Sequence, residues 1–422
     1  MRLLILTPGD GAPHAGPAAR DHALARSLRR LGHSVRIAPL HLPPRAGGAP
    51  ETYAPLFFGA NSSRLRQKAA LFRHTPHALD TVLDHPALLR LSPAPPPPAE
   101  LAADLLAGPD GPHAREYRRF TEWLKRELQP DAVLLSNSLL AGFAPAIRRA
   151  VKTRVIGAVQ GEDAGVEALG RERAAQIWKA VGRLAPEIDA WIAVSNACRD
   201  TFLQNTRVPA DSVHTIWSGI DLDAYSPAPA PPETPVIGYR GRLCAAKGLG
   251  KVVAAFTELK KELFFRDVRL RVIGAASTAD RVYMAALRRD LQAAGLQDEV
   301  EWHVNVDDDS KTFLLRGCTL VSVPPEHPEA FGLFVPETLA SGVPLVLPRR
   351  GSFPELIAAT GGGLLYEPDD AAGLTAAWRE ALARPEALAE AGRRGREAAP
   401  RLFRSDRMAR DTAALMYACS AR

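Results

Sequence analysis

Two carboxylates, Glu329 and Glu337, flank a glycine and an apolar run in the segment Glu329-Ala-Phe-Gly-Leu-Phe-Val-Pro-Glu337. On one continuous helix, eight steps of about 100° would leave the two side chains roughly 80° apart, so they would not share a face. We therefore place Glu329 on a loop after a predicted strand over 319–323 and start the next helix near Leu333, with Pro336 in its first turn. One glutamate can then reach a sugar hydroxyl and the other a ribose diol. The alternative is a solvated loop acid and an acid that complements the helix dipole.

Positive charge and glycines gather in a second segment, Gly238-Tyr-Arg-Gly241-Arg242-Leu-Cys-Ala-Ala-Lys247-Gly248, between a predicted strand over 236–238 and a predicted helix. Arginine forms a bidentate fork on phosphate, lysine supplies a point charge, and glycines let the backbone approach. The unbonded amides of Leu333 and Phe334 at the next helix start would add donors for an anion. These residues predict a phosphate-binding site, although either basic side chain taken alone is more often a solvated surface group.

Two further segments follow predicted strands in the N-terminal half. The loop from Gly9 to Gly16 has neither the GKS/GKT ending of a P-loop nor the GxGxxG pattern. It is either a simple strand-to-helix turn or a flexible loop that faces the anion from another domain. The segment Gln160-Gly-Glu-Asp163 follows a predicted strand over 155–159, a place where ligand-contacting residues lie. A surface turn there is nearly as simple an interpretation.

The elements that position these residues alternate between apolar strands and amphipathic helices. Leu3 to Leu6 predict a buried first strand, residues 18–31 a helix, and Gly32 its end. The pattern stops at Ser226-Pro-Ala-Pro-Ala-Pro-Pro-Glu, a linker, and then restarts. We predict an α/β fold with two Rossmann-like doubly wound domains that face each other across a cleft. The first spans 1–226, with an irregular insertion over 41–111, and the second spans 227–400.

Composition excludes several classes of protein. With 422 residues, 46% hydrophobic and 24% charged, the chain is an ordinary globular sequence rather than a disordered one. Its formal charge of +6 favours anionic partners. The four cysteines are far apart, so we expect a reducing, cytoplasmic compartment and no zinc site. Scattered arginines without an aromatic platform make a nucleic-acid partner the least favoured class.

These motifs together resemble the retaining glycosyltransferases of family 4, which have the GT-B fold. The resemblance is carried by EAFG-x4-E with a downstream SG-x-P over 329–344, and by GR-x4-KG over 241–248. Supporting matches are Gly16 before Gly32-His33, Ala193-Val194-Ser195, Ser218-Gly-Ile-Asp221 and Gly351-Ser-Phe-Pro-Glu355. It covers most of the chain except roughly 41–111, and it implies that the final helix over 401–422 returns to the first domain.

The resemblance implies a role for each matched residue. Arg242 and Lys247 would neutralise the diphosphate of a nucleoside-diphosphate sugar, with Gly16, Leu333 and Phe334 as backbone contacts. Glu329 would lie beside the donor sugar as a catalytic residue, and Glu337 would bind the ribose. No metal is expected, and we interpret Asp307-Asp-Asp309 as a helix N-cap. Gln160 would be the second catalytic residue, able to hydrogen-bond a sugar hydroxyl. It stands where many members have histidine, which puts acid–base chemistry there in doubt.

We therefore predict a hexosyl-type transferase (EC 2.4 class) that is metal-independent and moves a sugar to an unidentified acceptor. The alternatives are a catalytically silent GT-B protein that binds a nucleotide sugar and an epimerase of the same architecture. Basic segments over 64–73 and 115–126 are either solvated helix faces or a peripheral contact with an anionic membrane at its inner face. A membrane contact would make a lipid-linked acceptor plausible.

Overall fold

The computed structural model describes residues 1–8, 16–40, 98–367 and 370–419. Most of the predicted first loop, most of the predicted insertion and the basic segment over 64–73 lie outside the described residues. The chain forms two compact units. Unit 1 comprises Met1–Trp217 together with Met408–Arg422, and unit 2 comprises Ser218–Arg407.

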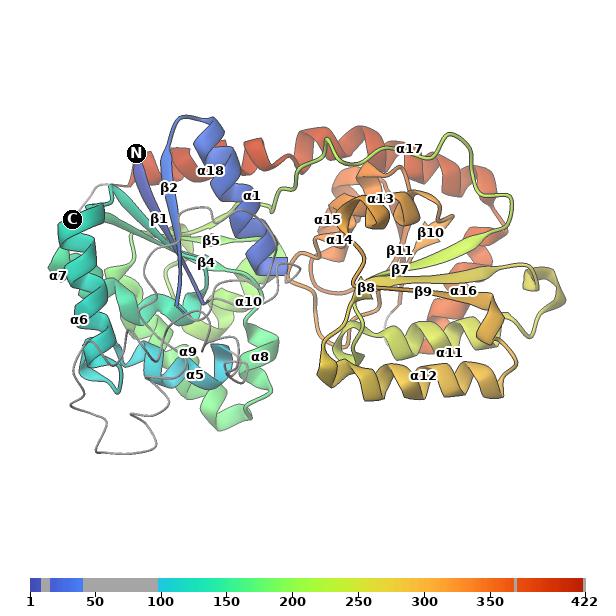
Figure 1. The fold of residues 1–422 in the computed structure, drawn as a ribbon, viewed down its shortest axis with the longest axis horizontal. Coiled ribbons are helices and arrows are strands. Elements are labelled where there is room, and N and C mark those ends of the chain that lie inside the picture. Colours follow the sequence, from blue (N-terminus) through green and yellow to red (C-terminus); the bar gives the residue numbers. More distant parts are fainter. Residues whose placement is uncertain (9–15, 41–97, 368–369, 420–422) are drawn as a thin grey trace. The chain divides into compact units, whose positions relative to one another are not determined.

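Unit 1 is built on a parallel six-stranded sheet in the order β2-β1-β3-β4-β5-β6 (Figure 1). Because β2 lies on one side of β1 and β3 on the other, the chain reverses its winding between β1 and β3. The strands are β1 (Arg2–Thr7), β2 (Ser34–Pro39), β3 (Ala132–Leu135), β4 (Arg154–Val159), β5 (Ala190–Ala193) and β6 (Val213–Thr215). The helices are α1 (Gly16–Arg30), α5 (Pro98–Leu106), α6 (Ala114–Trp123), α7 (Ala144–Ala150), α8 (Asp163–Glu167), α9 (Arg171–Leu184) and α10 (Asn196–Thr206).

Alternate residues of the unit 1 strands face one core. Leu3 and Ile5 of β1 point to the same side as Ile156 of β4, as the two-residue period of a strand requires. Leu24 of α1 packs on that side, together with Met416 of α18 (Ser405–Ala418). The last helix thus completes a core that begins with the first strand.

Unit 2 has a second parallel sheet, in the order β12-β11-β10-β7-β8-β9. In Figure 1, α11 and α12 lie on one side of this sheet, whereas α13, α14 and α15 lie on the other. The strands are β7 (Val236–Arg242), β8 (Arg269–Ala275), β9 (Val300–Val304), β10 (Leu320–Val321), β11 (Leu345–Pro348) and β12 (Gly363–Tyr366). The helices are α11 (Leu249–Leu259), α12 (Arg281–Ala293), α13 (Asp308–Arg316), α14 (Phe334–Ala340), α15 (Phe353–Thr360), α16 (Ala371–Leu382) and α17 (Pro385–Leu402).

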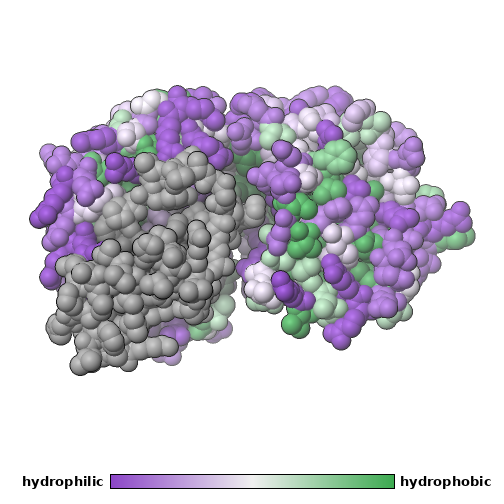
Figure 2. Space-filling model, in the orientation of Figure 1, coloured by the Kyte–Doolittle hydropathy of each residue, from purple (hydrophilic) through white to green (hydrophobic). Residues whose placement is uncertain are grey.

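The predicted α/β fold class is confirmed, and the elements predicted over 3–6, 18–31 and 155–159 fall within two residues of β1, α1 and β4. Two strands differ. β7 runs to Arg242 rather than ending at Gly238, because residues 236–242 all pair with β8. β10 contains only Leu320 and Val321. The visible face of unit 2 is mostly hydrophilic with scattered hydrophobic residues, as is normal for a protein surface (Figure 2).

Candidate functional site

The reversal of winding in unit 2 falls between β7 and β10, which are neighbours in the sheet. The chain winds to β8 and β9 on one side of β7, then to β11 and β12 on the other side of β10. The connections that leave the carboxyl ends of β7 and β10 therefore separate to opposite faces, which opens a binding position between them. The two motif segments singled out in the sequence are these two connections.

Lys247 and Glu329 meet at this point. Lys247 ends a short 3-10 turn (Ala245–Lys247) after β7, and Glu329 lies on the loop between β10 and α14. The Lys247 Nζ donates a hydrogen bond of 2.5 Å to Glu329 Oε2. The predicted phosphate-binding cation and the predicted sugar-side acid thus form one ion pair, although 82 residues separate them in the chain.

Glu329 is held by its backbone. The Ser352 amide donates a hydrogen bond of 3.0 Å to the Glu329 carbonyl, and the Ser352 hydroxyl lies 3.2 Å from the Phe331 carbonyl. Gly351 has φ +56°, and a Cβ there would lie 2.5 Å from the Glu329 carbonyl oxygen. The Gly351-Ser352 pair therefore sets the path of the loop that presents Glu329.

Arg242, the last residue of β7, carries an exposed guanidinium beside an acid. Its Nη2 lies 3.4 Å from Asp280 Oδ2. Burial would raise the pKa of Asp280, but hydrogen bonds from the Ser277 hydroxyl and amide, and the Arg242 charge, hold that pKa below its ordinary value. The buried Tyr239 hydroxyl lies 2.8 Å from the Arg242 carbonyl and 3.3 Å from the Lys247 carbonyl. It braces the turn that carries both basic side chains.

A pocket of about 530 Å³ opens beyond the ends of β8 and β9. It adjoins Arg242, because Arg242 pairs with Ala275, the residue before the lining segment that starts at Ala276. The Asn305 side chain ties the two strand ends together, through bonds of 2.9 Å from the Ala276 amide and 3.0 Å to the Ala276 carbonyl. The sequence reasoning missed this pocket. The sequence does contain a signal for it, because two further strands of the same sheet end at this pocket.

Glu337 does not stand alone. It lies on α14, and its Oε2 is 3.0 Å from Arg240 Nε, an ion-pair distance at which those two atoms are not aligned for a hydrogen bond. Sequence reasoning did not identify Arg240 as its partner. The amides of Leu333 and Phe334 at the start of α14 donate to no acceptor within the described residues. Their predicted role as donors to an anion stays a prediction.

In unit 1 the winding reverses between β1 and β3, and a polar cluster occupies that edge. Gln160 Nε2 donates to the Ser136 carbonyl at 2.6 Å and lies 3.3 Å from Asp21 Oδ1. Asp21 pairs with Arg20 at 3.1 Å, and both are almost fully buried. Burial raises the pKa of Asp21 to about 6, against the lowering effects of Arg20 and of hydrogen bonds. Glu162 accepts from the Gln160 and Ser138 amides, each at 2.8 Å.

These contacts orient Gln160 inward, because its side-chain amide donates to groups of its own unit. Arg20 and Asp21 were not predicted as site residues, since a charged pair inside a helix has the same sequence pattern as a solvated face. Gly16, the first residue of α1, has open space around the position of a Cβ. Packing against the described residues therefore does not require glycine there. Gly16 and Gln160 belong to unit 1, whereas the other six predicted site residues belong to unit 2.

Other predictions concern metals and membranes. No group of three or more histidine, cysteine, aspartate or glutamate side chains suited to a metal ion occurs in the described ranges. The Asp307 carboxylate accepts from the Ser310 amide at 2.7 Å, which confirms it as the N-cap of α13. Within the part of the chain that the structure describes, every helix is too short or too polar to cross a bilayer.

Comparison with known protein families accounts for both units. The family model described as glycosyl transferases group 1 matches residues 225–398, and the model described as Glycosyltransferase Family 4 matches residues 20–224. The first match contains Arg242, Lys247, Glu329 and Glu337, and the second contains Gln160.

Two of the similar curated proteins are named as glycosyltransferases. An MMP alpha-(1->4)-mannosyltransferase of Mycolicibacterium hassiacum is 26% identical over 248 residues, 58% of this chain and 57% of that protein. A D-inositol 3-phosphate glycosyltransferase of Xylanimonas cellulosilytica is 30% identical over 244 residues, 54% of this chain and 55% of that one. The chain thus spans little more than half the length of these two relatives.

Solved structures share the fold over nearly the whole chain. A sucrose-phosphate synthase from Thermosynechococcus elongatus has a TM-score of 0.72 at 17% identity, covering 99% of this chain and 98% of its own. HepE of Anabaena, solved in complex with UDP, has a TM-score of 0.71 at 16% identity, covering 99% and 100%. The chain therefore belongs to the glycosyltransferases of group 1 and family 4, and it has their GT-B fold.

Proposed function

We propose that this protein is a retaining glycosyltransferase that moves a sugar from a nucleoside-diphosphate sugar to an acceptor yet to be identified. One observation carries the proposal. Lys247 and Glu329 meet at the winding reversal of unit 2, beside the Arg242 guanidinium and the 530 Å³ pocket. Cations for a diphosphate, an acid for a sugar and a recess for a base then lie along one sheet edge.

Each part of the donor has a candidate partner. The base would enter the pocket after β8 and β9, and Arg242, Lys247 and the amides of Leu333 and Phe334 would bind the diphosphate. Glu337 would bind the ribose and Glu329 the sugar. Gly16 and Gln160 would act from unit 1, on the diphosphate and the sugar respectively. This assignment puts positive charge where the leaving group develops negative charge.

The chemistry follows from that charge arrangement. The bond between the anomeric carbon and the diphosphate oxygen breaks, and the electron pair leaves with the nucleoside diphosphate. Arg242 and Lys247 stabilise that charge by electrostatics fixed before the reaction. The sugar becomes oxocarbenium-like, and the Glu329 carboxylate favours its positive charge. The acceptor hydroxyl attacks the same face, loses its proton to the departing diphosphate, and configuration is retained.

The comparisons support this proposal and suggest the first ligand. A mannosyltransferase and inositol phosphate glycosyltransferases are among the curated relatives. HepE of Anabaena was solved with UDP and with UDP-glucose. We further propose that transfer needs no added metal and that the protein is cytoplasmic. Contact of the basic segment over 115–126 with an anionic membrane stays a prediction.

Calorimetric titration tests the donor site. UDP, GDP, ADP and their glucose, mannose and N-acetylglucosamine derivatives are titrated in the presence of EDTA. We expect micromolar binding of one nucleotide, weakened at least tenfold by Arg242→Ala. The matched control is Arg289→Ala, which removes an exposed arginine of α12 that does not line the pocket. No binding of any nucleotide to the folded protein would contradict the donor-site assignment.

Acceptor dependence then separates the activities that this fold can host. A transferase releases free nucleoside diphosphate faster when its acceptor is supplied. An epimerase converts the donor sugar with no acceptor, and a silent protein binds the donor without turnover. Donor consumption measured with and without a mixed acceptor extract decides among the three.

A further inference from the structure

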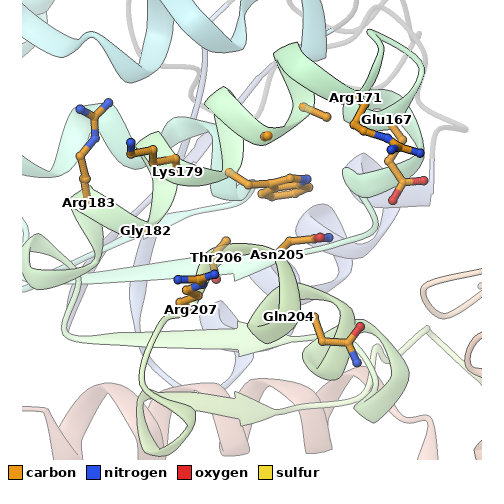
Figure 3. Close-up of a pocket in the computed structure, with 12 residues that line it drawn as sticks. Glu167, Arg171, Lys179, Gly182, Arg183, Gln204, Asn205, Thr206 and Arg207 are labelled. Carbon is orange, nitrogen blue, oxygen red and sulfur yellow. The ribbon is translucent and has the colours of Figure 1, made fainter.

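A second and larger pocket, of about 1000 Å³, lies wholly in unit 1 (Figure 3). Its walls are helices α9 and α10, and we call it the α9–α10 pocket. In a parallel sheet, a helix that follows one strand runs back to the amino edge before the next strand begins. The carboxyl ends of α9 and α10 thus lie at the edge opposite Gln160. The α9–α10 pocket shares no lining residue with the proposed donor site.

The two helices approach closely because of one glycine. A Cβ on Gly182 would lie 2.4 Å from the carbonyl oxygen of Thr206, so only glycine fits there. The contact brings Arg183, the next residue of α9, toward Arg207 at the end of α10. Arg207 has a left-handed backbone with φ 58°, and its amide donates to the Leu203 carbonyl at 3.0 Å.

The lining is strongly cationic. Four basic side chains, from Arg171, Lys179, Arg183 and Arg207, face one carboxylate, that of Glu167. Figure 3 shows Glu167 and Arg171 together at one end of the pocket, with Lys179 and Arg183 at the other and Arg207 across from α9. None of the four cations forms an ion pair with any described residue.

Helix dipoles do not balance this charge. The carboxyl ends of α9 and α10 each carry roughly half a negative charge, or about one between them. Three full positive charges, on Lys179, Arg183 and Arg207, lie at that end. The remaining positive charges repel one another, and a bound anion would reduce this repulsion. The side-chain amides of Gln204 and Asn205 add donors and acceptors on the same lining.

We propose that the α9–α10 pocket binds a phosphate-bearing, hydroxyl-rich ligand. The cations bind the phosphates, and the amides of Gln204 and Asn205 bind hydroxyls. The volume lies in the upper range for small-molecule sites, well beyond a single phosphate ion. A soluble phosphorylated sugar and the head group of an anionic phospholipid both have this chemistry. The proposal does not rest on the donor assignment in unit 2.

The test uses the full chain carrying Arg242→Ala, which weakens the proposed diphosphate site of unit 2. Inorganic tripolyphosphate is titrated by calorimetry at low ionic strength. We expect saturable binding that weakens at least tenfold in the double variant Lys179→Ala/Arg183→Ala. Arg207→Gly should also weaken it several-fold without straining the fold, because glycine adopts a positive φ readily.

The matched control is Arg173→Ala, which removes an exposed arginine of the same helix that does not line the pocket. This variant should bind tripolyphosphate within about twofold of its parent. Absence of saturable binding, or equal losses in Arg173→Ala and the pocket variants, would overturn the proposal, since either result indicates only a solvated basic face.

Vesicles distinguish the two sources of phosphate. Phosphatidylcholine vesicles with and without phosphatidylglycerol are sedimented with the same variants. A lipid head group as ligand predicts co-sedimentation that requires phosphatidylglycerol and is lost in the pocket variants. A soluble phosphorylated ligand predicts tripolyphosphate binding without vesicle association. Either pattern supports the site, and failure of both overturns it.

Discussion

Lys247 and Glu329 are joined by a hydrogen bond of 2.5 Å. Each residue therefore has this partner in addition to the part of the donor that it is proposed to bind. Without a ligand, the ammonium is neutralised by the carboxylate. A diphosphate bound at the proposed donor site would compete with Glu329 for Lys247 and with Asp280 for Arg242. Under that proposal the two acids keep the cations in place before a donor arrives, at some cost in affinity.

Glu329→Gln tests this competition. We expect the affinity for the bound nucleoside diphosphate to rise roughly threefold, because the substitution removes a partly buried ion pair from the free state. Transfer should fall about 100-fold, because the sugar loses a charge that stabilises its transition state. Calorimetry and initial rates measure the two effects. Equal losses in binding and in rate would mean that Glu329 acts only in binding.

Asp21 predicts a pH effect on stability. Its folded pKa is about 6, against 3.8 for an ordinary aspartate, so the folded chain binds the proton more tightly. The contribution of Asp21 to the free energy of unfolding therefore falls as pH rises across this window, by roughly 3 kcal/mol in all. A salt-bridged surface carboxylate has a lowered pKa, and its contribution to the free energy of unfolding rises with pH instead.

Urea unfolding of the wild type and of Asp21→Asn, from about pH 4 to pH 7, checks this sign. The stability of the wild type relative to the variant should decrease as pH rises. The test depends only on how the stability difference between wild type and variant changes with pH. The variant also leaves Arg20 without its carboxylate, but that loss of stability is the same at every pH and does not affect the test. A stability difference that is independent of pH would contradict the raised pKa.

At the scale of elements, the turn from β7 to α11 depends on Gly248. This residue has φ +72°, and a Cβ there would lie 1.7 Å from the Pro324 carbonyl oxygen. The close approach joins the Lys247 turn to the segment after β10 that leads to Glu329. One glycine therefore brings the two halves of the candidate site together.

Gly248→Ala should lower the free energy of unfolding of unit 2 by more than about 3 kcal/mol, from backbone strain plus the clash. Gly295→Ala is the matched control, because Gly295 has φ +70° but nothing within 4 Å of a Cβ. It should cost only about 1–2 kcal/mol. Chemical denaturation of both variants measures the difference. Similar losses of stability in the two variants would mean that the backbone around Pro324 shifts at little cost to accommodate the Cβ.

At the scale of the whole molecule, the final helix completes the core of unit 1. Met408 and Met416 are fully buried among strand residues that begin with Leu3. Arg154 Nε also donates to the Cys419 carbonyl at 2.7 Å. Unit 1 therefore combines residues 1–217 with residues 408–422, which are separated in the chain by the whole of unit 2.

Met416→Ala should destabilise the protein by about 2–5 kcal/mol, the usual loss for a buried methionine. Tyr417→Ala, at a neighbouring position that is 58% exposed, should change stability by less than about 0.5 kcal/mol. Thermal unfolding followed by circular dichroism compares them. An equal effect of the two substitutions would show that α18 does not pack in the unit 1 core in solution.

The α/β class and the location of site segments at strand ends follow from the sequence alone. Apolar runs such as Leu3 to Leu6, with helical periods between them, are local signals that one strand or helix carries by itself. Glycines and prolines mark where those elements stop. The motif segments around Arg242 and Glu329 could be recognised because each is continuous in the chain.

Only the tertiary structure decided which residues touch. The pairs Lys247–Glu329 and Arg240–Glu337, and the burial of Asp21 beside Gln160, join residues far apart in the chain. No local pattern encodes such pairs, because they depend on strand order, which is set by packing of whole elements. The α9–α10 pocket has the same origin. Its arginines look like a solvated face until the close contact at Gly182 places them around one cavity.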